Sequence, residues 1–89
     1  MQEQQVEIVN KLGLHARAAA KLVSTAAAYS SRVTLKFGGQ SADAKSIMSV
    51  MMLAAAKGSV ITISCDGKDE QAALTALVDL IGDYFGEEE

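Results

Sequence analysis

Three short segments of the chain alternate apolar and polar residues, and this alternation restricts the fold more than any other feature. They cover residues 5–10 (QVEIVN), 31–37 (SRVTLKF) and 59–65 (SVITISC). Alternation with period two is typical of β-strands that bury one face. A fourth, weaker strand is predicted at residues 40–44 (QSADA), directly after a Gly-Gly pair that is typical of a hairpin turn. Such strands build a sheet with one apolar face, which helices have to cover.

Three helical segments are predicted between and after these strands. The first covers about residues 16–29, which are almost all strong helix formers. The second covers about residues 47–57, with Ser46 as its N-cap and Gly58 as its C-terminal stop. The third follows Asp69 as its N-cap. Apolar residues at helical spacing predict the buried stripes of the first and third helices: Ala19, Leu22, Val23 and Ala26, and Leu74, Leu77, Val78 and Ile81.

The order of these elements predicts an α+β open-faced sandwich. It has a four-stranded antiparallel sheet with three helices packed on one face, in the order βαββαβα. With 89 residues, the chain is expected to form a single domain, residues 1–89, with one core.

Composition excludes several classes of protein. The formal net charge is -3, and the chain has neither a basic stripe nor a set of stacking aromatic residues, so no nucleic-acid partner is expected. No apolar stretch is long enough to span a bilayer, and no export signal is present, so we expect a cytoplasmic protein without a membrane partner. The single cysteine, Cys65, is interpreted as a small buried apolar residue, and the acidic residues at 87–89 as a solvated end.

His15 and Arg17 lie where the local field of a helix disfavours cations. A helix N-terminus carries partial positive charge, and its cap is usually Ser, Thr, Asp or Asn. An anion would resolve this conflict. The backbone N–H groups of Ala16, Arg17 and Ala18 form an anion-binding helix start, and the Arg17 guanidinium suits phosphate oxygens. His15 adds a nucleophilic nitrogen, so the site is predicted to stabilise a phosphoryl group held covalently by His15.

Other interpretations of the histidine are open at this point. A lone histidine is more often an ordinary, partly exposed residue, with Arg17 as surface charge. A metal site lacks a second histidine and a nearby cysteine. A Ser-His-Asp hydrolase lacks a serine on a nucleophile elbow. We therefore expect no metal and no cofactor.

The second predicted helix has almost no polar face. A short helix in a small domain needs only part of its surface for the core, so some of its side chains are candidates for contact with a partner. Methionines suit such a surface because they repack easily. The candidate docking residues on the two helices are Ala16, Ala20, Ile47, Met48 and Met51.

Two segments, LGLHARAAAKLV (residues 12–23) and KSIMSVMMLAAAKGSVITI (residues 45–63), resemble the histidine-containing phosphocarrier family HPr of the bacterial phosphotransferase system. The resemblance covers nearly the whole chain. The family usually has proline where this chain has Ala18, and alanine keeps helical geometry while it restores a backbone N–H. The segment EIVNKLGLHAR and the acidic end are more similar to the nitrogen-related branch of the family than to its sugar-transport branch.

This resemblance implies a carrier rather than an enzyme. His15 would accept a phosphoryl group on Nδ1 from phosphorylated enzyme I, with phosphoenolpyruvate as the ultimate donor. It would pass the group to a histidine of an enzyme IIA-type domain, with Arg17 stabilising the phosphate. The family also implies that Ser46 is a regulatory site for an HPr kinase/phosphorylase. We expect a monomer. The competing hypotheses are a small-molecule-sensing domain of similar arrangement and a small phosphatase with a phospho-His15 intermediate.

Overall fold

The elements of the protein follow one another in the predicted order. The structure, a computed structural model, describes residues 1–86, so the prediction for the acidic end at 87–89 lies outside the described residues. The helices and strands are β1 (Gln2–Glu7), α1 (Ala16–Ala27), β2 (Arg32–Phe37), β3 (Gln40–Asp43), α2 (Ile47–Met52), β4 (Val60–Asp66) and α3 (Glu70–Gly82), followed by a short 3₁₀ turn, η1 (Tyr84–Gly86).

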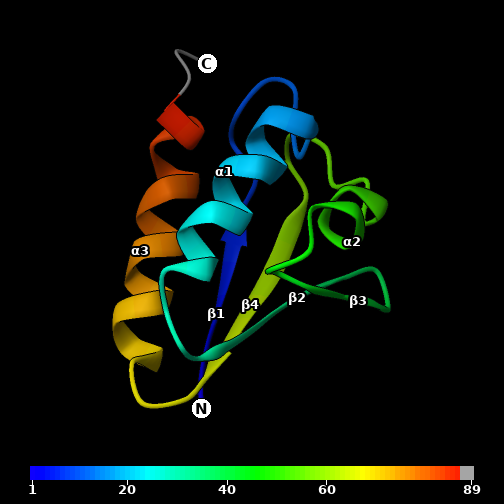
Figure 1. Ribbon diagram of the computed structural model, residues 1–89. Helices are drawn as coiled ribbons and strands as arrows, with labels where there is room; N and C mark the ends of the chain where they lie inside the picture. The colour runs from blue at the N-terminus through cyan, green and yellow to red at the C-terminus, as the bar shows by residue number, and fades with distance from the viewer. Residues whose placement is uncertain (87–89) are drawn as a thin grey trace.

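The four strands form one antiparallel sheet in the order β1-β4-β2-β3. In the central pair, Val33 lies opposite Cys65 and Leu35 opposite Ile63, and all four side chains are buried. Figure 1 shows α1 and α3 side by side across the sheet, with α2 near β3. The predicted α+β fold, a four-stranded antiparallel sheet with three helices, is therefore confirmed. Within residues 1–86, every helix is too short or too polar to cross a lipid bilayer.

Two predicted element boundaries are wrong. The first strand is Gln2–Glu7 rather than 5–10, because its antiparallel ladder to β4 extends to the start of the chain. The second helix ends at Met52 rather than near residue 57. Ala54 has a φ of 54°, which stops the helix. Gly58 instead belongs to the turn before β4, where its N–H donates to the Ile8 carbonyl at 2.8 Å.

The side chain of Asp69 does not cap α3, although Asp69 occupies the predicted N-cap position. Its carboxylate instead accepts hydrogen bonds from the backbone N–H groups of Ser30 and Ser31, each at 2.9 Å, and from both serine hydroxyls. These bonds lower the pKa of Asp69 to about 2. The network ties the turn after α1 to the start of α3.

Candidate functional site

The loop before α1 is held in place by buried hydrogen bonds. Asn10 is fully buried, and its side-chain amide donates to the Gly13 carbonyl at 2.8 Å. The Gly13 N–H donates back to the Asn10 carbonyl at 3.2 Å. Leu14 is buried in the core, and its N–H donates to the Ala55 carbonyl at 2.9 Å. The backbone that leads into His15 is therefore held in a fixed position.

Glycine is required at position 13. Its φ is 66°, in the left-handed region that disfavours other residues. A Cβ there would lie 2.6 Å from the Ala55 carbonyl oxygen and 2.8 Å from the Ala56 Cα. The segment after α2 thus passes directly against this loop. In the structure α2 has already ended at Met52 when the chain reaches this contact, and the Ala55 carbonyl accepts the Leu14 N–H outside the helix.

His15 occupies the N-cap position of α1 in extended conformation (φ −76°, ψ 177°). Its carbonyl accepts the first helical hydrogen bond, from Ala19, at 2.8 Å. Among the described residues, its side chain makes no capping hydrogen bond to α1, and the first turn holds no acidic residue. His15 is half-buried. The imidazole is therefore at the surface of the helix start and does not serve as its cap.

The helix start brings together the groups predicted for anion binding. The first helical bond is donated by Ala19, so the N–H groups of Ala16, Arg17 and Ala18 have no acceptor within the helix. Arg17 and Ala16 are exposed in the same turn, whereas the Ala18 side chain is fully buried. A site with three backbone donors, one guanidinium and one imidazole can hold an anion close to the imidazole ring.

An exposed apolar surface accompanies this site. On α2, which packs against α1, the exposed fractions are 45% for Ile47, 70% for Met48, 39% for Met51 and 72% for Met52. Ala16 and Ala20 are exposed on α1. Sequence reasoning missed Met52 and also Leu12, which is 66% exposed in the loop before His15. Hydropathy alone could not have separated them from the core residues Val50 and Leu53.

Ser46 caps α2 as predicted. Its hydroxyl oxygen accepts a hydrogen bond from the Ser49 N–H at 3.3 Å, and its side chain is half-buried. The residue precedes the exposed Ile47 and Met48. A charge added at Ser46 would therefore lie at the edge of the apolar surface of α2.

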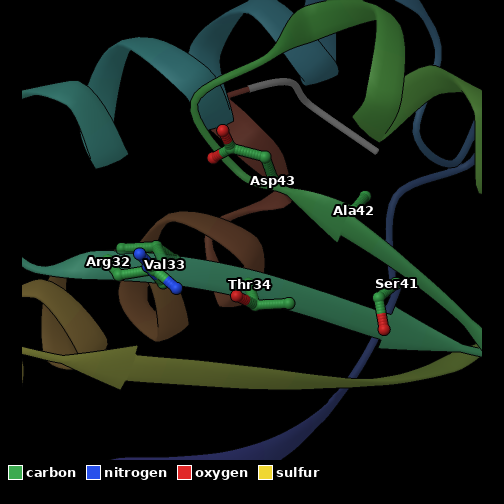
Figure 2. Close-up of a pocket in the computed structure, with 6 residues that line it drawn as sticks. All are labelled: Arg32, Val33, Thr34, Ser41, Ala42 and Asp43. Carbon is green, nitrogen blue, oxygen red and sulfur yellow. The ribbon is translucent and has the colours of Figure 1, made fainter.

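A cavity on the sheet bears on the hypothesis of a small-molecule sensor. It measures about 350 Å³ and is lined by Arg32, Val33, Thr34, Ser41, Ala42 and Asp43 of β2 and β3 (Figure 2). Figure 2 shows Arg32 on β2 and Asp43 on β3, so the lining carries one charged side chain from each of the two strands. The cavity contains none of the predicted site residues.

Two further expectations concern metal and thiol chemistry. Residues 1–86 contain no group of three or more histidine, cysteine or acidic side chains placed to hold a metal ion. Cys65 is fully buried in β4, which confirms its predicted place in the core. Burial raises the pKa of the Cys65 thiol, so its nucleophilic thiolate form is disfavoured.

The fold and the site together define a class: a small α+β sandwich with a histidine and an arginine at the start of its first helix. Comparison with known proteins identifies this class. The model of the family described as "PTS HPr component phosphorylation site" matches residues 2–83. The phosphocarrier proteins HPr of Neisseria meningitidis serogroup A and of Cupriavidus necator are each 53% identical over 89 residues, covering 100% of both chains.

Solved structures agree with this family. A crystal structure of HPr from Thermoanaerobacter tengcongensis has a TM-score of 0.96 and 47% sequence identity, and all of both chains is covered. A swapped dimer of the Bacillus subtilis protein Crh has a TM-score of 0.76 and 40% identity, covering 94% of this chain and 97% of the other. The chain belongs to the HPr family. It is a phosphocarrier protein of the phosphotransferase system.

Proposed function

We propose that His15 is the residue that carries the phosphoryl group, which it receives from phosphorylated enzyme I and gives to an enzyme IIA-type domain. The observation that supports this proposal most directly is the place of His15 at the N-cap of α1 without a capping role, beside three N–H groups that have no acceptor in the helix. In each transfer, a bond forms between phosphorus and a ring nitrogen of the acceptor while the bond to the donor breaks.

The charge of the bound phosphoryl group explains the unusual composition of the helix start. Its oxygens would accept hydrogen bonds from the N–H groups of residues 16–18 and from the Arg17 guanidinium, with further stabilisation by the helix dipole. The nearest acidic residue before His15 in the sequence is Glu7, and the nearest one after it is Asp43. The sequence near His15 therefore supplies no carboxylate to activate a water molecule, which suits a group that must survive until it meets the next acceptor.

The docking surface for both partners is proposed to combine the start of α1 with the exposed side of α2. Its predicted members are Ala16, Ala20, Ile47, Met48 and Met51, and the exposure of Met52 and Leu12 adds two more. An apolar, methionine-rich surface can adapt to two different partners.

Ser46 is proposed as a regulatory site for an HPr kinase/phosphorylase. A phosphate there would add about −1.5 to −2 charges. Because Ser46 directly precedes the apolar surface of α2, this charge would weaken docking while the cap remains.

The remaining finer assignments stay predictions. They are the nitrogen-related branch, the cytoplasmic location and the monomeric state. Related structures include dimers, among them an HPr dimer from Thermoanaerobacter tengcongensis. Light scattering at several protein concentrations measures the oligomeric state. Transfer assays with enzyme I and IIA proteins from each branch test the branch.

Mass spectrometry tests the carrier proposal directly. After incubation with enzyme I and phosphoenolpyruvate, we expect one acid-labile phosphate on His15, and its loss when an enzyme IIA-type domain is added. A small phosphatase would instead hydrolyse a simple phosphate ester repeatedly without a partner. A small-molecule sensor would gain no phosphate. A stable chain with no phosphate on His15 after this incubation would refute the proposal.

A further inference from the structure

The turn after α3 has a strained backbone. Tyr84 and Phe85 have φ values of 58° and 55°, and Gly86 has a φ of 77°. Left-handed backbone is unfavourable for residues with a Cβ, so two such residues in succession are unusual. Strain of this kind persists only where the surrounding structure holds it in place. The contacts around this turn must therefore hold its backbone in place.

Two contacts hold the turn. Phe85 is fully buried in the core, and its carbonyl accepts a hydrogen bond from Nζ of Lys21 at 2.7 Å. The Lys21 side chain is half-buried, and a charged donor makes this bond stronger than a neutral one. A Cβ at Gly86 would lie 3.3 Å from Lys21 Nζ, so glycine leaves room for the ammonium group.

Lys21 belongs to the helix that carries the proposed phosphoryl site. It lies one helical turn after Arg17 on the same face of α1, and a long helical side chain points toward the N-terminus of its helix. In Figure 1 the last turn, drawn in red, lies beside α1 at the end of the molecule where α1 begins. The Asp69 network joins α1 to α3 at the opposite end of α1. The two helices are thus joined near both ends.

We infer that Lys21 and the turn Tyr84–Gly86 form a clasp that fixes the position of α1 for phosphoryl transfer, with Lys21 as a positioning residue. This inference rests on the proposed role of His15. The imidazole, the backbone donors and Arg17 all belong to the first turn of α1 or its cap, so a small tilt of α1 displaces them together. Transfer between two proteins depends on the alignment of donor and acceptor, and a displacement of about 1 Å can cost a rate factor of about 100.

The test compares Lys21→Met with the wild type and with Lys21→Arg. Lys21→Met keeps an apolar stem and removes the donor, whereas Lys21→Arg keeps a donor. Lys68→Met, at an exposed position in the turn before α3, is the matched control for the loss of one positive charge. Phe85 is not a suitable variant because its truncation would damage the core.

The measurements are the maximal rate and the KM for phosphoryl transfer from enzyme I, and the hydrogen exchange of the amides in the first turns of α1. For Lys21→Met we expect a maximal rate lowered about fivefold, an unchanged KM and faster exchange in α1, an effect smaller than a full 1 Å displacement would give. Lys21→Arg should restore most of the rate, and Lys68→Met should behave as the wild type.

Three outcomes would overturn the clasp while wild-type His15 still accepts phosphate. The first is an unchanged transfer rate and unchanged exchange in Lys21→Met. The second is a raised KM with an unchanged maximal rate in Lys21→Met, which would make Lys21 a docking cation. The third is a Lys21→Arg variant that transfers as slowly as Lys21→Met. If the wild type itself gains no phosphate, the proposed function fails instead. Faster exchange in α1 of Lys21→Met would still report the clasp in that case.

Discussion

The two ends of α1 differ in how they are stabilised. At its start, the N-cap His15 makes no capping bond within the described chain, and the cation Arg17 lies in the first turn. After its end, Ser30 and Ser31 donate both their N–H groups and their hydroxyls to the Asp69 carboxylate. The start of the helix therefore carries a cap residue and a charge that are unusual for an N-terminus, whereas the segment after its end is bonded to the start of α3. We interpret this difference as the effect of the proposed phosphoryl site on the first end and of stability on the second.

Among the variants of α1 and its neighbours, loss of His15 should have the largest effect on phosphoryl transfer. His15→Ala is expected to abolish phosphoryl acceptance and to lower the free energy of unfolding by no more than about 1 kcal/mol, because the side chain is half-buried and makes no capping bond to α1. Mass spectrometry after reaction with enzyme I, together with thermal unfolding, measures both. The chain has no other histidine, so an acid-labile phosphate on this variant would contradict the assignment.

Removal of Arg17 should separate function from stability. Arg17→Ala is expected to slow transfer roughly 10- to 100-fold, because the phosphoryl oxygens lose a charged donor in the site. Its melting temperature should stay the same or rise, since the variant removes a cation from the positive end of the helix. Arg32→Ala, on β2, is the matched control, because Arg17 and Arg32 are the two arginines of the chain. Equal transfer rates for both variants would rule out the role of Arg17.

At the other end, Asp69→Asn should lower stability and leave transfer unchanged. An amide cannot accept the same set of hydrogen bonds, and its own donors oppose those of Ser31. We expect a clear fall in melting temperature, whereas Asp79→Asn on the exposed side of α3 should show little change. Transfer kinetics at a temperature where both variants are folded provide the second measurement. A large loss of transfer in Asp69→Asn would show that the two ends of α1 are not independent.

The lowered pKa of Asp69 also predicts how the stability of the protein changes at acid pH. Its pKa is lowered from 3.8 to about 2 in the folded protein, so its contribution to stability is complete above the unfolded value and is lost as the pH falls through about 2. The free energy of unfolding of the wild type should therefore decrease between about pH 4 and pH 2. In Asp69→Asn this part of the acid dependence should be absent. Equal slopes for the two proteins in urea titrations over this range would contradict the role of Asp69.

Local rules predicted the elements of the fold and pointed to the candidate site at the start of α1. Each of these signals lies within one turn or one strand of the sequence. They are the alternation in β2 and β4, the alanine-rich composition of α1, and the cation Arg17 in its first turn. The errors arise where distant residues compete with local preference. The segment after α2 is not helical, and the Ala55 carbonyl in it accepts a hydrogen bond from the Leu14 N–H. Asp69 stays at the N-cap position of α3, but its carboxylate bonds Ser30 and Ser31 instead of the helix. The Lys21 bond to Phe85 joins residues too far apart in the sequence for any periodicity to indicate.

The apolar surface beside the start of α1 gives a smaller expected effect. Met48→Asp should raise the KM for enzyme I several-fold, because a charge replaces an exposed apolar contact. The domain should remain folded, since Met48 is 70% exposed. Ala72→Asp, at an exposed position on α3, controls for the added charge. A large fall in the melting temperature of Met48→Asp would show that Met48 belongs to the core and that partners dock elsewhere.

Ser46→Asp should give the smallest effect, and it tests whether the docking surface on α2 extends to Ser46. The variant should fold normally, because aspartate caps a helix as well as serine does. It should nevertheless receive phosphate from enzyme I a few-fold more slowly, since its charge lies directly before Ile47 and Met48. Ser46→Asn is the matched control, because asparagine also caps but carries no charge.

Salt distinguishes the two physical causes of this slowing. Long-range repulsion between Ser46→Asp and its partner would weaken as the ionic strength rises from 0.1 to 1 M, since the Debye length falls from about 10 Å to about 3 Å. A desolvation cost would persist at high salt, because it depends on burial of the charge in the complex. Aspartate carries less charge than phosphoserine, so the effect is a lower limit for phosphorylation. Identical kinetics for the aspartate variant, the asparagine variant and a protein with phosphoserine at position 46 would leave Ser46 as a helix cap alone.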